Sequence, residues 1–270
     1  MKNQLLLVIA FFQISLASFG QQSTSPYKTS FKVDAPIVGG GLAVSGAGLY
    51  LISNKHGIDQ DKLAGLTKDD VNAFDRFTAG NYSESANNIS DIPLYTSFAL
   101  PFALIIDKKA FQAGPQIFLL YTETMAITGS IYAMTAGLVY RKRPLVYGTE
   151  APLRTRTTKN ANNSFFAGHV AATASATFFA AKVFNDFNPD SPLRPVVWGV
   201  AAALPASVGY LRLEAGKHFL SDVILGYGIG TTVGILVPHL HKKNNDSGFS
   251  ITPTYDRIEG NGIALTYTFK

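Results

Sequence analysis

Five apolar segments alternate with short polar loops over the second part of the chain, at residues 94–106, 117–140, 165–184, 195–211 and 219–238. Ala, Gly, Ser and Thr are frequent in these segments, and such small residues let helices approach closely, as they do in membrane bundles. The run "GYGIG" at 226–230 is a packing surface of this kind. It is not a dinucleotide-binding fingerprint, because the required spacing and a preceding strand are missing. The pattern predicts an all-α bundle of about five to six core helices, most simply transmembrane.

The N-terminal part has a different pattern. Residues 36–52 are apolar enough for a helix, but they include five glycines, which weaken helix propensity. In "LTKDDVNAFDRFTAG", Thr67 and Asp70 have the spacing of a capping box and Gly80 can end a helix, so a short helix is predicted. The polar stretch 81–91 is predicted to be a loop.

Both ends of the chain carry recognisable signals. Residues 1–20 combine Lys2, a short apolar run and small residues at a break, which is typical of a secretory signal peptide. An uncleaved anchor helix is the alternative. The tail alternates apolar and polar residues on both sides of 259–262, which predicts a β-hairpin. The expected organisation is a signal peptide at 1–20, a polar and Gly-rich region at 21–93, a helical core at 94–240 and a hairpin tail at 241–270.

Composition narrows the function classes. The chain has 270 residues and no cysteine, which excludes disulfides and thiolate metal sites. Only 15% of its residues are charged, and the mean hydropathy is +0.14, a value that fits a membrane protein or a dense soluble bundle. The net charge of +5 comes without a basic run interleaved with aromatic residues, so no nucleic-acid partner is expected.

Three polar clusters interrupt the apolar segments and hold the candidate chemistry. They contain Arg141, Lys142, Arg143 and Pro144; then Gly168 and His169; and finally Arg212, His218 and Asp222.

The third cluster has the most informative spacing. If a helix begins near His218, that histidine and Asp222 share one helix face, one turn apart. A carboxylate beside a histidine keeps one ring nitrogen protonated and leaves the other free as a nucleophile. Arg212 suits bidentate contact with phosphate. Antiparallel pairing of neighbouring segments brings all three clusters to one end of the bundle, where they predict an anion pocket for phosphoryl transfer through a phosphohistidine.

With these residues in place, the sequence resembles the type 2 phosphatidic acid phosphatase superfamily, which also contains class A acid phosphatases and vanadium haloperoxidases. The motifs of that family are K-x6-RP, PSGH and SR-x5-H-x3-D, and the resemblance covers residues 94–240. Here the motifs read Ala136-x6-Arg143-Pro144, Phe166-Ala167-Gly168-His169 and Leu211-Arg212-x5-His218-x3-Asp222. Three of the departures from these motifs matter, namely Ala136 for the lysine, Ala167 for the serine of PSGH and Leu211 for the serine before the third-motif arginine.

The resemblance implies a role for each matching residue. His218 would attack phosphorus, Asp222 would orient it and His169 would protonate the leaving oxygen. The phosphate would be held by Arg143, Arg212 and the Gly168 amide, with Arg141 and Lys142 as candidates to replace the missing motif lysine. This chemistry requires no metal or other cofactor.

The resemblance implies a phosphatase acting on a phospholipid or a prenyl phosphate or pyrophosphate. The alternatives are a soluble periplasmic acid phosphatase, a degenerate non-catalytic membrane member of the family, and a vanadate-dependent haloperoxidase. The short chain and the missing motif lysine disfavour the haloperoxidase.

Charges in the loops give an expected topology. With a cleaved signal and five spans, the loops at 107–109, 182–194 and 239–243 lie inside and the three clusters face the periplasm. This requires 36–52 not to span, since otherwise the site turns inward. Segment 94–106 is short for a span, so a soluble exported protein, or one associated with the outer membrane, stays open.

Two further features of the sequence each allow two interpretations. Glu123 lies within an apolar segment and marks either a function in the membrane or a hydrogen-bonded acid facing the bundle. His239 and His241 form either a metal site or, as expected, a solvated helix end.

Overall fold

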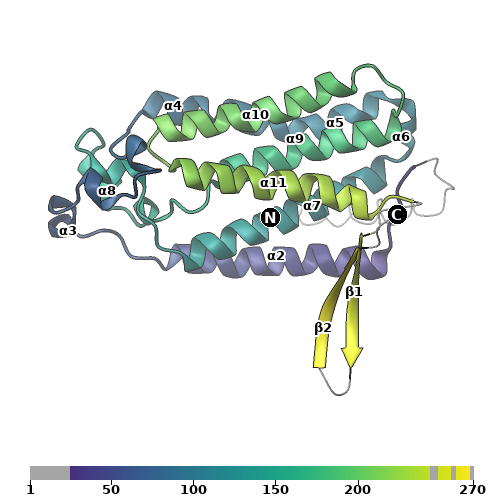
Figure 1. Ribbon diagram of the computed structural model, residues 1–270, viewed down its shortest axis with the longest axis horizontal. Helices are drawn as coiled ribbons and strands as arrows, with labels where there is room; N and C mark the ends of the chain where they lie inside the picture. Colours follow the sequence, from purple (N-terminus) through teal and green to yellow (C-terminus); the bar gives the residue numbers. More distant parts are fainter. Residues whose placement is uncertain (1–24, 244–248, 257–259, 268–270) are drawn as a thin grey trace, which may run out of the picture.

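The computed structural model describes residues 25–243, 249–256 and 260–267, and most of them form long helices lying side by side (Figure 1). The expected segment 1–20 lies outside the described residues. The long helices are α2 Phe31–Ser53, α5 Asp91–Ala103, α7 Gly114–Leu138, α9 Gly168–Phe187, α10 Arg194–Glu214 and α11 Leu220–Leu240. The predicted all-α bundle is confirmed.

Short elements connect the long helices. The short α-helices are α3 Gln60–Ala64, α4 Glu84–Ile89, α6 Lys108–Gln112 and α8 Leu153–Thr157. The 3-10 turns are η2 Lys68–Asp70, η3 Arg76–Thr78, η4 Leu104–Ile106, η5 Pro144–Tyr147 and η6 Lys159–Asn162.

Helix α9 is the centre of the bundle, because it packs against α5, α7, α10 and α11. Fourteen of its 20 residues are buried, and most of these are small. Helix α11 approaches it through Gly226, Gly230 and Gly234, as the small-residue pattern predicted. A Cβ atom at Gly230 would lie only 2.2 Å from the carbonyl oxygen of Ala171, so these two backbones are in direct contact.

Helix α2 is part of the bundle, although its glycines made a span at 36–52 doubtful. It packs along α7, and a Cβ atom at Gly48 would lie 2.3 Å from the carbonyl carbon of Ala133. The glycines therefore allow a close helix contact, which compensates for their low helix propensity. The 23 residues of α2 are long and apolar enough to cross a membrane, so the five-span topology left out a helix.

The region before α5 also differs from the prediction. Residues 81–91 are not all loop, because α4 begins after Ser83, whose Oγ accepts a hydrogen bond of 3.1 Å from the Ala86 amide. Together α4, α5 and η4 make a 23-residue candidate span, Glu84–Ile106, which removes the length objection to 94–106. The Thr67–Asp70 capping box is present, but it caps only the turn η2 and not the longer helix that was predicted.

Large apolar side chains cover the outer surface of the bundle. Tyr50 is 70% exposed and Ile106 is 86% exposed, and both belong to candidate spans. Among the residues that the structure describes, five helical segments meet the length and hydropathy of a membrane span, namely α2, residues 84–106, α7, α10 and α11. An exposed apolar surface of this extent requires a lipid environment, so the chain is a membrane protein.

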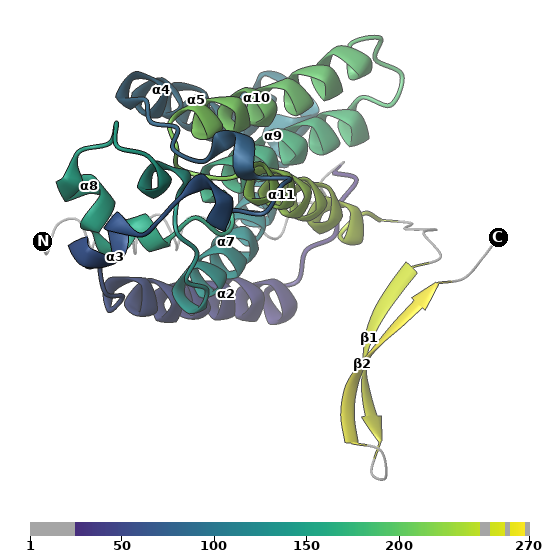
Figure 2. The same cartoon turned by 60° about the vertical axis from the view of Figure 1, so that its left-hand side comes forward.

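The long helices run in alternating directions and give the bundle two distinct ends. The short elements α3 and α8 lie at one end, together with the C-terminus of α7 and the N-terminus of α11 (Figures 1 and 2). At the opposite end the Lys28 amide donates to the His241 carbonyl at 2.7 Å, and the Lys243 amide donates to the Pro26 carbonyl at 2.7 Å. The first and last described residues of the helical part therefore lie together.

A β-hairpin follows the bundle, as the tail pattern predicted. Strands β1 Phe249–Asp256 and β2 Gly260–Tyr267 pair antiparallel, with Pro253 opposite Ile263. The residues from Gly260 to Gly262, expected in the turn, belong to β2. Figure 2 shows the hairpin apart from the helices.

The close contact between α9 and α11 gives a stability prediction. Gly230→Ala is expected to lower the free energy of unfolding by about 1–3 kcal/mol, since the methyl group has no room. Gly228→Ala is the matched control, because no atom lies within 4 Å of its Cβ position. Thermal unfolding in detergent, followed by circular dichroism, compares the two variants. Equal midpoints would contradict the helix contact.

Candidate active site

Main-chain hydrogen bonds join the three polar clusters at the end of the bundle near α8. The Arg143 amide donates to the Ala161 carbonyl at 2.8 Å, which ties the first cluster to the loop before α9. The Ala167 amide donates to the Asp222 carbonyl at 3.1 Å and ties the second cluster to the third. The Leu145 amide donates to the Gly216 carbonyl at 3.1 Å and closes the set. The convergence expected from antiparallel pairing is present.

The turn between α10 and α11 sets the spacing of the third cluster. Gly216 has φ +64°, and the amides of Gly216 and Lys217 donate to the carbonyls of Leu213 and Arg212 at 3.0 and 3.1 Å. These are the two hydrogen bonds of a Schellman motif, which ends a helix with a left-handed glycine. The motif reverses the chain within a few residues and holds His218 beside the end of α10, where Arg212 lies.

His218 is 2% exposed and has a defined tautomer. Its Nδ1 lies 2.6 Å from the carbonyl oxygen of Ser164. Because a carbonyl only accepts hydrogen bonds, Nδ1 carries the proton and Nε2 keeps its lone pair. Burial, followed by the positive charges of Arg143 and Arg212, lowers the pKa of His218 well below its usual range. The imidazole is therefore neutral at physiological pH, as a nucleophile must be.

Asp222 does not contact His218 in the way the sequence suggested. Its carboxylate accepts hydrogen bonds from the Ser164 hydroxyl at 2.6 Å, from the Phe219 amide at 2.9 Å and from Arg141. The reason is that α11 begins only at Leu220, so His218 precedes the helix and the one-turn spacing does not apply. Ser164 stands between the two residues, since its carbonyl binds the histidine and its hydroxyl binds Asp222.

Arg141 is fully engaged in ion pairs, contrary to its expected role at the phosphate. Besides Asp222, it donates to Asp75 Oδ2 at 2.7 Å and to Ser221 Oγ at 3.0 Å. Asp75 is 1% exposed, and nothing in the sequence pattern marked it. Lys142 is partly exposed and forms no hydrogen bond or ion pair within the described part of the chain. Neither residue is placed as a substitute for the missing lysine.

Arg143 and Arg212 are buried cations without an acidic partner among the described residues. Arg143 is 6% exposed and donates to the Asn163 carbonyl at 3.3 Å and to Asn160 Oδ1 at 3.1 Å. Arg212 is 4% exposed and donates to Asn87 Oδ1 at 3.0 Å, while its buried Nε has no hydrogen-bond partner. Two buried guanidinium groups held by neutral acceptors form a site for an anion.

Lys217 adds a third cation that sequence reasoning missed. It precedes His218 directly and is partly buried. Burial and the positive charges of Arg143 and Arg212 lower the pKa of Lys217 to about 8, against the opposing charge of Glu84. The sequence did offer a signal for it. The position of the motif lysine is occupied by Ala136, a fully buried residue of α7, while another lysine stands next to the motif histidine.

His169 lies in the first turn of α9 and faces an acid that was assigned to a loop. Its Nε2 is 3.5 Å from Asp91 Oδ1, and both side chains are partly exposed. The positive charge of protonated His169 contributes to lowering the pKa of His218, so the two histidines are neighbours. Gly168 is needed for packing, because a Cβ atom there would lie 2.5 Å from the ring of Tyr132. Contact of the Gly168 amide with phosphate stays a prediction.

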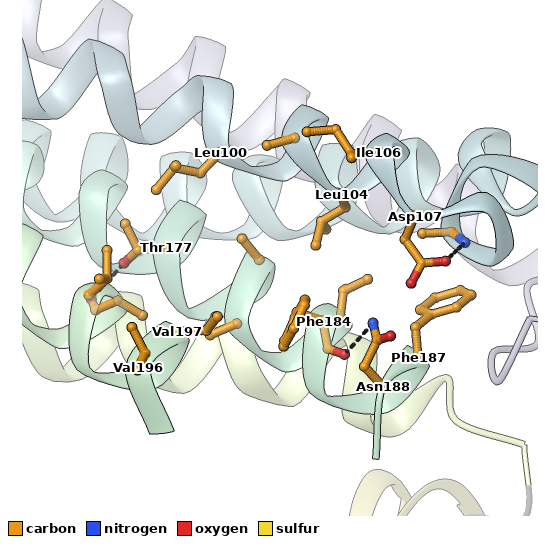
Figure 3. A pocket seen from close by; sticks show the side chains of 17 residues that line it. Leu100, Leu104, Ile106, Asp107, Thr177, Phe184, Phe187, Asn188, Val196 and Val197 are labelled. Atoms are coloured by element: carbon orange, nitrogen blue, oxygen red, sulfur yellow. Dashed lines mark hydrogen bonds between the residues drawn. The ribbon is translucent and has the colours of Figure 1, made fainter. Parts of the chain in front are cut away.

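An apolar pocket of about 460 Å³ lies elsewhere in the molecule, between α5, α9 and α10 (Figure 3). Its lining includes Leu100, Phe184 and Val197, and no residue of the three polar clusters. It is therefore separate from the cationic site.

The ion pairs of Arg141 lead to a second stability prediction. Arg141→Leu leaves the buried Asp222 and Asp75 carboxylates without their cation, which is expected to cost about 3–5 kcal/mol of unfolding free energy. Lys142→Leu is the control and should change stability by less than about 0.5 kcal/mol. Thermal melts of both variants test this. A phosphate-binding role for Arg141 would instead leave stability unchanged and weaken binding of inorganic phosphate.

Comparisons with known proteins give a solved structure and a family model. A solved structure that matches is a transmembrane PAP2 type phosphatidylglycerolphosphate phosphatase from Bacillus subtilis, with 18% sequence identity and a TM-score of 0.41 over 86% of this chain and 92% of that chain. No curated protein matches the sequence. The family model described as "PAP2 superfamily" matches residues 117–246, which hold all three polar clusters. Through this region, from α7 to the end of α11 and just under half of the chain, the sequence is similar to the PAP2 superfamily.

Proposed function

We propose that this chain is a membrane phosphatase that hydrolyses a lipid phosphate or pyrophosphate ester through a phosphohistidine at His218. The observation that carries the proposal is the arrangement around that residue. A neutral, buried imidazole with a free Nε2 lies among cations that have no acidic partner in the described chain. Cations beside a nucleophile stabilise the charge that spreads over the phosphoryl oxygens in the transition state.

The first step forms a bond between His218 Nε2 and phosphorus and breaks the bond between phosphorus and the leaving oxygen. His169 donates a proton to that oxygen, and the lipid alcohol or the monophosphate leaves. Burial and the positive charge of Arg212 lower the pKa of His169 to about 4 in the free protein, against the opposing charge of Asp91. The negative charge of the bound phosphate would raise this pKa and so supply the protonated form before transfer. In the second step, water loses a proton to His169 and attacks phosphorus, which releases inorganic phosphate and restores His218.

Removal of the nucleophile tests the mechanism. His218→Ala is expected to abolish release of inorganic phosphate from phosphatidic acid, a prenyl pyrophosphate and p-nitrophenyl phosphate. Trapping with labelled substrate should give an acid-labile, alkali-stable phosphoenzyme in the wild type only. The control is His56→Ala, an exposed histidine outside the cationic site. Full activity of His218→Ala would end the phosphohistidine mechanism.

Comparing two substrates distinguishes the role of His169 as an acid from that of His218 as the nucleophile. His169→Ala should slow hydrolysis of phosphatidic acid by about 10²–10⁴-fold, because an alkoxide leaving group needs a proton. Hydrolysis of p-nitrophenyl phosphate should fall much less, since nitrophenolate leaves unprotonated. Equal losses on both substrates would remove the acid role of His169.

Lys217 gives a pH prediction. Its pKa of about 8 means that the cation is present below this pH and is lost as the pH rises through it. We expect the kcat/KM of the wild type to fall above about pH 8, because the free enzyme then loses a phosphate-binding charge. In Lys217→Arg this fall should move to higher pH, since arginine stays protonated.

A variant without the positive charge of Lys217 complements the pH measurement. At neutral pH, Lys217→Met should lower kcat/KM about 10- to 100-fold, the value of one charged hydrogen bond. The control is Lys142→Met. If the alkaline fall is the same in Lys217→Arg as in the wild type, Lys217 is not its cause.

The orientation in the membrane depends on α2. This helix carries the chain once across the bundle, from Tyr27 at the far end to the cationic site. We propose that an exported leader leaves Tyr27 outside and the site on the cytoplasmic face, which reverses the periplasmic face expected from five spans. Even with the opposite orientation, the site and Tyr27 stay on opposite faces.

The absence of cysteine makes the orientation directly measurable. Single cysteines at Asp190 and at Glu150, exposed residues at opposite ends of the bundle, report the two faces. A membrane-impermeant maleimide added to intact cells or spheroplasts should label Asp190→Cys and not Glu150→Cys. Labelling of Glu150→Cys alone would restore the periplasmic face.

A non-catalytic family member is the second candidate, and Ala136 and Ala167 favour it because they remove phosphate contacts of the motif. Such a protein would bind lipid phosphate without releasing inorganic phosphate from any of the three substrates. The same substrate panel therefore decides between the two functions.

A further inference from the structure

Three groups that can ligate a metal ion meet at the end of the bundle opposite the cationic site. Asp34 comes from the first turn of α2, Glu123 from the middle of α7 and His241 from the residue that ends α11. Their ligand atoms all lie within 4.8 Å of one another. Nε2 of His241 is 3.3 Å from Asp34 Oδ1 and 3.6 Å from Glu123 Oε2.

The tautomer of His241 makes this cluster chemically unusual. Its Nδ1 lies 2.8 Å from the carbonyl oxygen of Val237, so Nδ1 carries a proton. Nε2 faces one oxygen of each carboxylate, where it either carries a second proton or offers its lone pair to a metal ion. A second hydrogen bond that fixes the free nitrogen in this way is typical of histidines that bind metals.

Burial makes the missing positive charge costly. Asp34 is 1% exposed and Glu123 is 3% exposed. Oε2 of Glu123 is buried without a hydrogen-bond partner. No Lys or Arg in the described ranges forms an ion pair with either acid, and His241 is the basic residue that lies near both. Two buried carboxylates need a positive charge between them, which a metal ion bound to Nε2 or a proton on Nε2 would supply.

The distances suit a transition metal. Ligands of a tetrahedral Zn²⁺ lie about 2.0–2.2 Å from the ion, which places them about 3.3–3.5 Å from one another. The two measured separations, 3.3 and 3.6 Å, are close to this value. One imidazole and two carboxylates also suit borderline divalent ions better than Ca²⁺ or Mg²⁺, which bind oxygen ligands.

We propose that Asp34, Glu123 and His241 bind one divalent transition-metal ion, with Zn²⁺ as the best fit. The ion would join α2 to α7 and α11 at the end where the described chain begins, with water completing its coordination. Its role is structural, because His241 follows the last residue of α11 whereas His218 precedes the first. The sequence had suggested no metal and a solvated helix end at His241, which is instead only 14% exposed at its side chain.

The experiment uses the full chain, purified in detergent without a histidine tag. After treatment with chelator and dialysis against Zn²⁺, elemental analysis is expected to give about one ion per chain, and Zn²⁺ should raise the midpoint of thermal unfolding. Glu123→Gln and His241→Ala should lose both effects. His56→Ala and Glu150→Gln, at exposed residues of the opposite end, should keep them.

Cobalt gives a readout that does not depend on the variants folding well. Wild-type protein loaded with Co²⁺ should show a saturable visible absorption that Zn²⁺ removes by competition. Absence of stoichiometric Zn²⁺ and of the cobalt spectrum would overturn the proposal, and a proton shared by the three groups would then explain them. Equal metal content in the wild type, Glu123→Gln and His241→Ala would overturn it as well.

Discussion

The buried carboxylate of Asp222 is the interaction on which the cationic end of the bundle depends. A charge with no solvent exposure must be satisfied on every side, and Asp222 draws Arg141, the Ser164 hydroxyl and the Phe219 amide toward it. These three partners belong to three different loops. The carboxylate therefore assembles the site, and Ser164, once held, orients His218 through its carbonyl oxygen.

Each end of the bundle holds buried or partly buried charges that have no ion-pair partner of fixed opposite charge in the described chain. These are Arg143, Arg212 and Lys217 at one end, and Asp34 and Glu123, which face only His241, at the other. Buried charges of one sign are costly, and functional sites are where proteins accept that cost. Both proposals therefore place an ion of opposite sign at these charges, a phosphate at the first end and a metal ion at the second.

The departures from the family motifs acquire a physical interpretation in this arrangement. Ala136 on α7 occupies the position of the motif lysine, and the Schellman turn places Lys217 beside the motif histidine. In the proposed site Lys217 would supply the positive charge that Ala136 lacks, from a different direction. Arg141, the nearer candidate along the chain, is committed to the Asp222 network and is not free for this role.

Local pattern alone determined the long helices from α7 to α11, the tail hairpin and the three polar clusters, because hydrophobic periodicity and motif spacing are properties of neighbouring residues. The local pattern did not establish α2 as a span, because its glycines stabilise the helix through a close contact with α7, which lies far along the chain. Only the tertiary structure decided that Asp222 acts through Ser164, that Asp91 faces His169 and that Asp34, Glu123 and His241 meet. Residues so distant in sequence are brought together by the packing of whole helices, and no local pattern of a single chain records that packing.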